Sequence, residues 1–146
     1  MRLLGLDYGT RRLGLAISDE DGIIANPIPP LERSRSLNRD LMTLRRLVRE
    51  REIGAVVIGL PYNMDGSEGE MVRAVKAFAD ELRKRIGIQV IGYDERRTTQ
   101  KAEGALLDAN LTRKRRKELR DSVAAALILR SYLDERGSAQ EEPPGN

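Results

Sequence analysis

The stretch LLGLDYGTRRLGLAISD, residues 3–19, decides how the chain begins to fold. Its first apolar run starts at Leu3 and ends on the carboxylate of Asp7, and a second run covers Leu13 to Ser18 after the turn YGTRR. Two apolar runs joined by a short glycine-containing turn predict a β-hairpin. An Asp before a glycine is most often a turn residue. A carboxylate at the end of a buried strand also suits a metal ion, or the phosphate-binding hairpin of an ATPase.

The rest of the chain predicts an α/β fold. The segment GIIANPIPPLER reads as a third strand whose prolines suit a sheet edge, and the apolar runs AVVIGL and IQVIGYDE read as two more. We expect a central mixed five-stranded sheet, with three antiparallel N-terminal strands followed by parallel strands, flanked by helices on both faces. Residues 1–136 would form a single domain, and residues 137–146 a disordered tail.

Helix boundaries follow from capping residues. The expected helices run from a cap at Ser36 to Glu52, from near Ser67 to about Arg85, from Gln100 to about Asp108 after a cap at Thr99, and from a cap at Thr112 to Leu133.

Composition excludes several kinds of chemistry. The 146 residues contain no cysteine and no histidine, which excludes thiolate and histidine metal sites and the usual histidine general base. No signal-peptide pattern or membrane-spanning apolar run is present. We therefore expect a cytoplasmic protein, without a membrane partner, whose chemistry depends on carboxylates and hard metal ions.

Basic residues are concentrated in one segment. Residues 96–120 contain nine Lys or Arg and three Asp or Glu, a local charge of +6 in a chain of net charge +3. Such a segment is either a solvated helix face or a surface that binds a polyanion such as nucleic acid.

Three acidic positions could form a site. Asp7 and the Asp94–Glu95 pair follow strands whose carboxyl ends should meet at one edge of the sheet. Alternation along the strand should direct only one of Asp94 and Glu95 toward the site. Asp121 begins a helical stripe that is otherwise apolar. A carboxylate there would need a partner, which is either an arginine or a metal ion shared with the strand-end acids.

Three carboxylates without histidine would make an oxygen-only site. Such ligands suit Mg²⁺ or Mn²⁺. Two such ions could polarise a phosphodiester and activate a water molecule, with the basic segment holding the nucleic-acid backbone beside them.

Four motifs in order resemble the YqgF/RuvX family of the ribonuclease H-like superfamily. They are LDYGTRRLGLA, VIGLPYNMDGSEG, YDERRTT and DSVAAALIL, and the resemblance covers nearly the whole chain. It implies a ribonuclease H-like, two-metal endonuclease with Asp7, Glu95 and Asp121 as ligands, so it selects Glu95 over Asp94. Other positions that match the family, or lie in the basic segment, are assigned to backbone geometry and phosphate loops (Gly9, Gly14, Gly59, Pro61, Gly66) or to nucleic-acid binding (Arg12, Arg96, Arg97, Thr99, Arg113, Lys114, Arg115, Arg116, Lys117). Arg97 stands where we expected an apolar residue, so its role is open.

The family resemblance leaves two substrates open. Members are proposed as Holliday-junction resolvases, which favours a two-fold homodimer, or as nucleases that trim the 5′ end of the 16S ribosomal RNA precursor. Two other functions compete with the nuclease. A non-catalytic nucleic-acid-binding module would need the basic segment but not the acids. An actin-like or sugar-kinase ATPase would use the GLDYGT hairpin, but a second hairpin of that kind is absent from the sequence.

Overall fold

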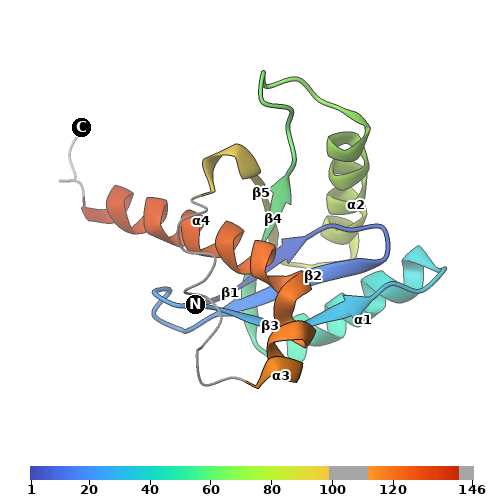
Figure 1. Ribbon diagram of the computed structural model, residues 1–146, viewed down its shortest axis with the longest axis horizontal. Helices are drawn as coiled ribbons and strands as arrows, with labels where there is room; N and C mark the ends of the chain where they lie inside the picture. The colour runs from blue at the N-terminus through green and yellow to red at the C-terminus, as the bar shows by residue number, and fades with distance from the viewer. Residues whose placement is uncertain (99–111, 142–146) are drawn as a thin grey trace.

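A five-stranded mixed sheet forms the centre of the computed structural model, which describes residues 1–98 and 112–141 (Figure 1). Its strands lie in the order β3-β2-β1-β4-β5. The pairs β3–β2 and β2–β1 are antiparallel, and the pairs β1–β4 and β4–β5 are parallel. The expected fold class is confirmed. The strand bounds are β1 Arg2–Asp7, β2 Arg12–Ser18, β3 Ala25–Glu32, β4 Ile53–Leu60 and β5 Gln89–Asp94.

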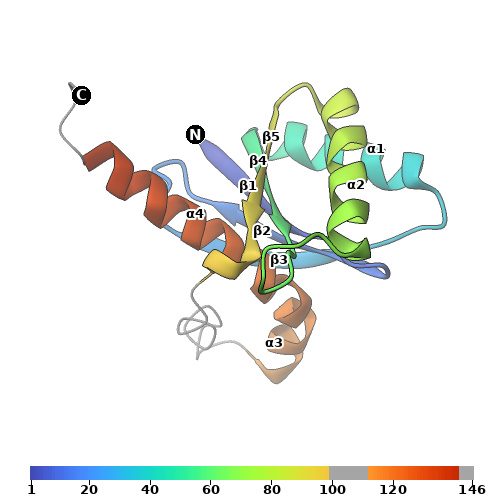
Figure 2. The ribbon, with the colours of Figure 1, turned by 90° about the horizontal axis from the view of Figure 1, so that it is seen from above.

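Helices cover both faces of this sheet. Figure 2 separates α1 (Leu37–Glu50) and α2 (Glu70–Ile86) from α4 (Val123–Glu141), which lies on the opposite side of the strands. Leu4, Leu6, Val56 and Ile58 belong to the core with α1 and α2. Leu3, Ala55 and Val57 belong to the core with α4. Strand alternation therefore assigns each residue of β1 and β4 to one helical layer.

The edge strand β3 contains Pro27, Pro29 and Pro30 and, within the described part of the chain, pairs only with β2. Proline lacks the N–H that a central strand needs on both sides, so the edge position expected from the sequence is confirmed. None of the described helices is long and apolar enough to cross a membrane.

Helix starts were predicted with mixed success. Ser36 caps α1 as expected, because its side chain accepts a hydrogen bond from the Arg39 N–H. Ser67 does not cap α2, whose N-cap is Gly69. The Ser67 hydroxyl instead donates to Asp65, at 2.6 Å, and accepts from Asn63. The expected cap at Thr99 and the helix over residues 100–108 lie outside the described residues.

The C-terminal helical region is broken where one helix was expected. Thr112 caps α3 (Arg113–Leu119), and a 3-10 turn, η4 (Arg120–Ser122), separates it from α4. The turn brings the buried Ser122 hydroxyl to the Leu15 N–H, 3.2 Å away, beside an irregularity in β2–β3 pairing between Leu13 and Leu15. Helix α4 continues to Glu141, beyond the helix end expected at Leu133.

Candidate active site

The candidate site lies on the α4 face, at the edge where β1, β4 and β5 end. Because Leu3 faces α4, alternation along β1 places Asp7 on the same face. The same rule places Glu95 there, since Tyr93 of β5 also belongs to the α4 core. Asp94 points the other way and pairs with Arg96, whose Nη2 is 2.6 Å from Asp94 Oδ2. The structure therefore brings Glu95, and not Asp94, to Asp7.

Asp7 and Glu95 form a hydrogen-bonded carboxyl pair. Burial, and then the charge of Asp7, raise the pKa of Glu95 to about 7. Burial also raises the pKa of Asp7. Two half-buried carboxylates in contact cannot both carry a negative charge cheaply, so the pair retains a proton near neutral pH. The neutral Glu95 carboxyl then donates the hydrogen bond to Asp7.

Gly59 leaves the space that Glu95 occupies. A Cβ at this position of β4 would lie 2.5 Å from Glu95 Oε1 and 2.5 Å from Ile128 Cδ1 of α4. Any larger residue would therefore displace the side chains of Glu95 and Ile128.

Asp121 lies beside the pair but is held by an arginine. Its Oδ2 is 3.0 Å from Arg12 Nη1, while Arg12 Nε is 2.8 Å from Glu32 Oε1. The expectation of a carboxylate on a buried stripe is wrong, because Asp121 lies in the η4 turn with 48% of its side chain exposed. The sequence left two partners open for the Asp121 carboxylate, an arginine or a metal ion, and in the structure it is paired with Arg12.

Gly14 brings Asp121 close to Asp7 through the backbone. A Cβ at Gly14 would lie 2.3 Å from the Asp121 carbonyl oxygen and 3.4 Å from Asp7 Cβ. The two acidic residues thus flank one glycine of β2. Even so, no three acidic side chains in the described part of the chain form a group that could hold a metal ion.

Two hollows adjoin these carboxylates. One, of about 380 Å³, is lined by Asp7, Glu95, Thr98 and Arg120, together with residues of α4. The other, a groove of about 690 Å³ between β3 and α3, is lined by Arg12, Pro29, Pro30, Glu32, Lys114, Lys117, Glu118, Arg120 and Asp121. Arg120 is common to both.

The five basic residues of α3 expected to bind nucleic acid are all exposed (Arg113, Lys114, Arg115, Arg116, Lys117). Only Lys114 and Lys117 among them line the groove, and Arg115 pairs with Glu118 at 3.2 Å. Arg120 was missed as an individual site residue. Its position directly before Asp121, at the end of the basic segment, was the available signal.

The remaining expected site residues have other partners or fall outside the description. Arg97 pairs with Glu135 of α4 at 2.8 Å, and Tyr93 donates a hydrogen bond to the same carboxylate, so Arg97 braces the turn after β5 against α4. Gly66 adopts a φ of +87°, which favours glycine, and a Cβ there would lie 3.3 Å from Arg96 Nη1. Gly9 lies in the β1–β2 turn, where a Cβ would be 2.4 Å from the Arg12 carbonyl oxygen. Pro61 lines a further hollow beside Glu95, and Thr99 is not among the described residues.

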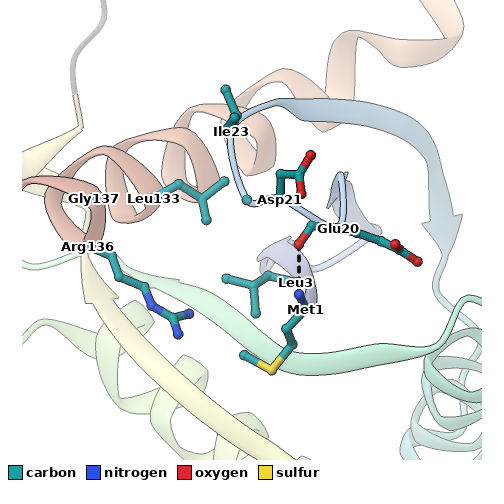
Figure 3. A pocket seen from close by; sticks show the side chains of 9 residues that line it. Met1, Leu3, Glu20, Asp21, Ile23, Leu133, Arg136 and Gly137 are labelled. Atoms are coloured by element: carbon teal, nitrogen blue, oxygen red, sulfur yellow. Dashed lines mark hydrogen bonds between the residues drawn. The ribbon is translucent and has the colours of Figure 1, made fainter. Parts of the chain in front are cut away.

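A separate hollow lies between the start of β1, the loop after β2 and the second half of α4 (Figure 3). Its volume is about 240 Å³. The N-terminal ammonium group of Met1 donates to the Glu20 carbonyl at its rim. This hollow lies at the amino end of β1, whereas functional groups in such sheets gather at the carboxyl ends. The carboxylate pair is therefore the better candidate.

The fold resembles that of RuvC. Two structures of Thermus thermophilus RuvC each match over 94% of this chain. RuvC alone is covered over 97% of its length, with a TM-score of 0.56 and 15% identity. RuvC in complex with a Holliday junction substrate is covered over 96% of its length, with a TM-score of 0.60 and 16% identity. The sheet order and these matches define the ribonuclease H-like fold.

The chain belongs to the RuvX family. Residues 1–135 match the family model described as "RuvX: Holliday junction resolvase". A Moorella thermoacetica protein named "Putative pre-16S rRNA nuclease" is 45% identical over 137 residues, which cover 94% of this chain and 97% of that protein. A Myxococcus xanthus protein of the same name is 46% identical over 134 residues, covering 92% and 88%. The protein is thus an enzyme of a nuclease family.

Proposed function

We propose that the protein is a metal-dependent endonuclease that hydrolyses phosphodiester bonds with Asp7, Glu95 and Asp121 as its metal ligands. The contact between Asp7 and Glu95 carries this proposal. A carboxyl that retains a proton to about pH 7 in the absence of metal has an environment in which a cation could replace that proton.

The donor set fits a hard divalent ion. Carboxylate oxygens alone favour Mg²⁺ or Mn²⁺ over zinc or copper. When bound, two such ions would activate a water molecule and stabilise the leaving oxygen. To join the other two ligands, Asp121 would exchange its ion pair with Arg12 for the metal, and Arg12 would become available to a phosphate.

The side chains around the pair have positioning roles in this proposal. Arg120 lines the same hollow as Asp7 and Glu95, and would hold the phosphate that enters it. The basic residues of α3 would bind the adjoining backbone by charge, without reading base sequence.

The substrate is a Holliday junction or the 5′ end of the 16S ribosomal RNA precursor, and the enzyme would act in the cytoplasm. The family description favours the first substrate and the relatives' names favour the second. Cutting a junction symmetrically would also require a second copy of the chain.

The decisive experiment offers a four-way DNA junction, single-stranded DNA and a 16S precursor leader to the purified protein with Mg²⁺ or Mn²⁺. We expect cleavage of at least one substrate, and a loss of about 10²-fold or more in Asp7→Asn, Glu95→Gln and Asp121→Asn. Binding should persist in each variant. Asp134→Asn, an exposed carboxylate on α4, is the matched control.

Two results would contradict the proposal. If the wild-type protein binds nucleic acid but cuts no substrate with either metal ion, the protein is a non-catalytic binding module. If the three site variants cut as fast as Asp134→Asn, the catalytic centre lies elsewhere.

A further inference from the structure

Three hollows follow one another along the edge of the sheet where β1, β4 and β5 end. The groove beside α3 and the carboxylate hollow share Arg120. The carboxylate hollow shares Glu95 and Thr98 with a third hollow of about 480 Å³, which Pro61, Tyr62 and Met64 also line. The shared residues make the three hollows neighbours, with the carboxylate pair in the middle.

The groove beside α3 contains cations that form no ion pair with an acidic side chain of the described residues. Arg12 is paired with Glu32 and Asp121, and Glu118 is paired with Arg115. Lys114, Lys117 and Arg120 line the same groove. These three cations form no ion pair with any residue in the described ranges, so an anion would meet them without first displacing a carboxylate.

The third hollow offers apolar surface beside positive charge. Met64 is 87% exposed, so its apolar side chain is accessible to a ligand. Two cations lie near the Tyr62 ring, with Lys76 Nζ 5.3 Å and Arg96 Cζ 5.7 Å from its centroid. Each of them is also paired with a carboxylate, Lys76 with Glu68 and Arg96 with Asp94. Such a surface suits a nucleotide base with a phosphate attached to it.

We propose that the three hollows form one continuous track for an unpaired nucleic-acid strand, in which Arg120 holds the phosphate next to the Asp7–Glu95 pair. The backbone enters along Lys114 and Lys117, crosses the carboxylates, and leaves with a base packed against Tyr62 and Met64. This inference rests on the proposed nuclease function and specifies the form of its substrate.

An unpaired strand fits the track better than a duplex. The carboxylates are half-buried in a hollow of about 380 Å³, so the phosphodiester has to enter that hollow to reach them. Cations combined with an accessible apolar and a partly exposed aromatic side chain are typical of proteins that bind single strands. In a regular duplex, the bases are stacked within the helix and unavailable to Tyr62.

Binding in EDTA tests the track without requiring cleavage. We would measure fluorescence anisotropy with a fluorescein-labelled single-stranded 12-mer, as DNA and as RNA, and with the blunt duplex of the same sequence, over a range of salt concentrations. We expect at least about tenfold tighter binding of the single strand. Arg120→Ala should weaken it severalfold and reduce the slope of log K against log salt by about 0.7, the contribution of one phosphate.

Three further variants distinguish the contribution of the Arg120 charge from that of stacking on Tyr62, and provide a control for the fold. Arg120→Lys should keep the salt slope of the wild type, because it keeps the charge. Tyr62→Leu should weaken binding about tenfold without changing the slope. Arg46→Ala removes an exposed arginine of α1, on the other side of the sheet, and should bind as the wild type does.

Equal binding of duplex and single strand, or an Arg120→Ala variant that matches Arg46→Ala, would overturn the track. Failure of the nuclease proposal gives a different result. In that case the wild type cuts nothing with Mg²⁺ or Mn²⁺, while the binding pattern in EDTA stays as expected.

Discussion

The proton shared by Asp7 and Glu95 should make the stability of the metal-free protein depend on pH. The pKa of Glu95 is raised from 4.5 to about 7 in the folded chain. A group whose folded pKa is raised stabilises the fold below its unfolded pKa, and that contribution is lost as pH rises through the folded pKa. We therefore expect the free energy of unfolding contributed by this group to fall between about pH 4.5 and pH 7.

The size of this effect follows from the shift. If the whole pKa shift of Glu95 were expressed as unfolding free energy, it would correspond to about 3 kcal/mol. Because the carboxyl is only half-buried, solvent screening reduces this to about 1–2 kcal/mol. Glu95→Gln stays neutral at every pH and keeps a hydrogen-bond donor for Asp7. At pH 8 this variant should be more stable than the wild type by about that amount, and at pH 5 the two should be equal.

Urea unfolding in EDTA at pH 5, 6, 7 and 8 measures this difference. Glu50→Gln, at the exposed end of α1, is the matched control and should follow the wild type at each pH. If the wild type and Glu95→Gln have the same stability profile from pH 5 to pH 8, the Asp7–Glu95 pair does not share a proton and the reasoning fails.

Two further predictions concern packing and buried charge. Gly14→Ala should destabilise the protein by about 1–3 kcal/mol, because its Cβ would lie 2.3 Å from a backbone oxygen of Asp121. A Cβ at Gly137 would have nothing within 4 Å, so Gly137→Ala should not destabilise the protein in the same urea assay. Equal losses of stability in the two variants would contradict the Gly14 contact. Asp40→Ala should cost about 3–5 kcal/mol in that assay, because Asp40 is 2% exposed and accepts hydrogen bonds from Arg33 and Ser34. A loss below about 1 kcal/mol would indicate that water replaces the carboxylate.

Strand positions could be predicted well because each strand follows from a local apolar run. Such runs identify Leu3 to Asp7 and residues 55–60 as strands without any knowledge of their partners. The prolines of the third strand also placed it at the edge. Asp7 and one member of the Asp94–Glu95 pair could be expected to meet because the carboxyl ends of parallel strands lie at one edge of a sheet. The choice of Glu95 came only from the family resemblance.

Features that depend on distant contacts could not be predicted. The helix stripe beginning at Asp121 looked continuous, but Ser122 bonds to Leu15, 107 residues away, and a 3-10 turn interrupts the helical region there. That turn exposes Asp121 to Arg12. Ser67 has capping-box spacing to Glu70, but its hydroxyl is hydrogen-bonded to Asp65 and Asn63 instead of to the start of α2. In both cases side-chain hydrogen bonds decide the local structure.

The prolines of β3 also restrict how copies of this chain can associate. Pro27 and Pro29 are two residues apart in the strand, so the N–H groups that they lack would both point toward the same edge of β3. Among the described strands β3 pairs only with β2, so the missing donors lie on its outer side. A strand from another molecule would find no donors at these positions. Growth of the sheet across β3 is thereby disfavoured, which protects the protein against edge-to-edge aggregation and means that two copies are not expected to join by pairing their β3 strands.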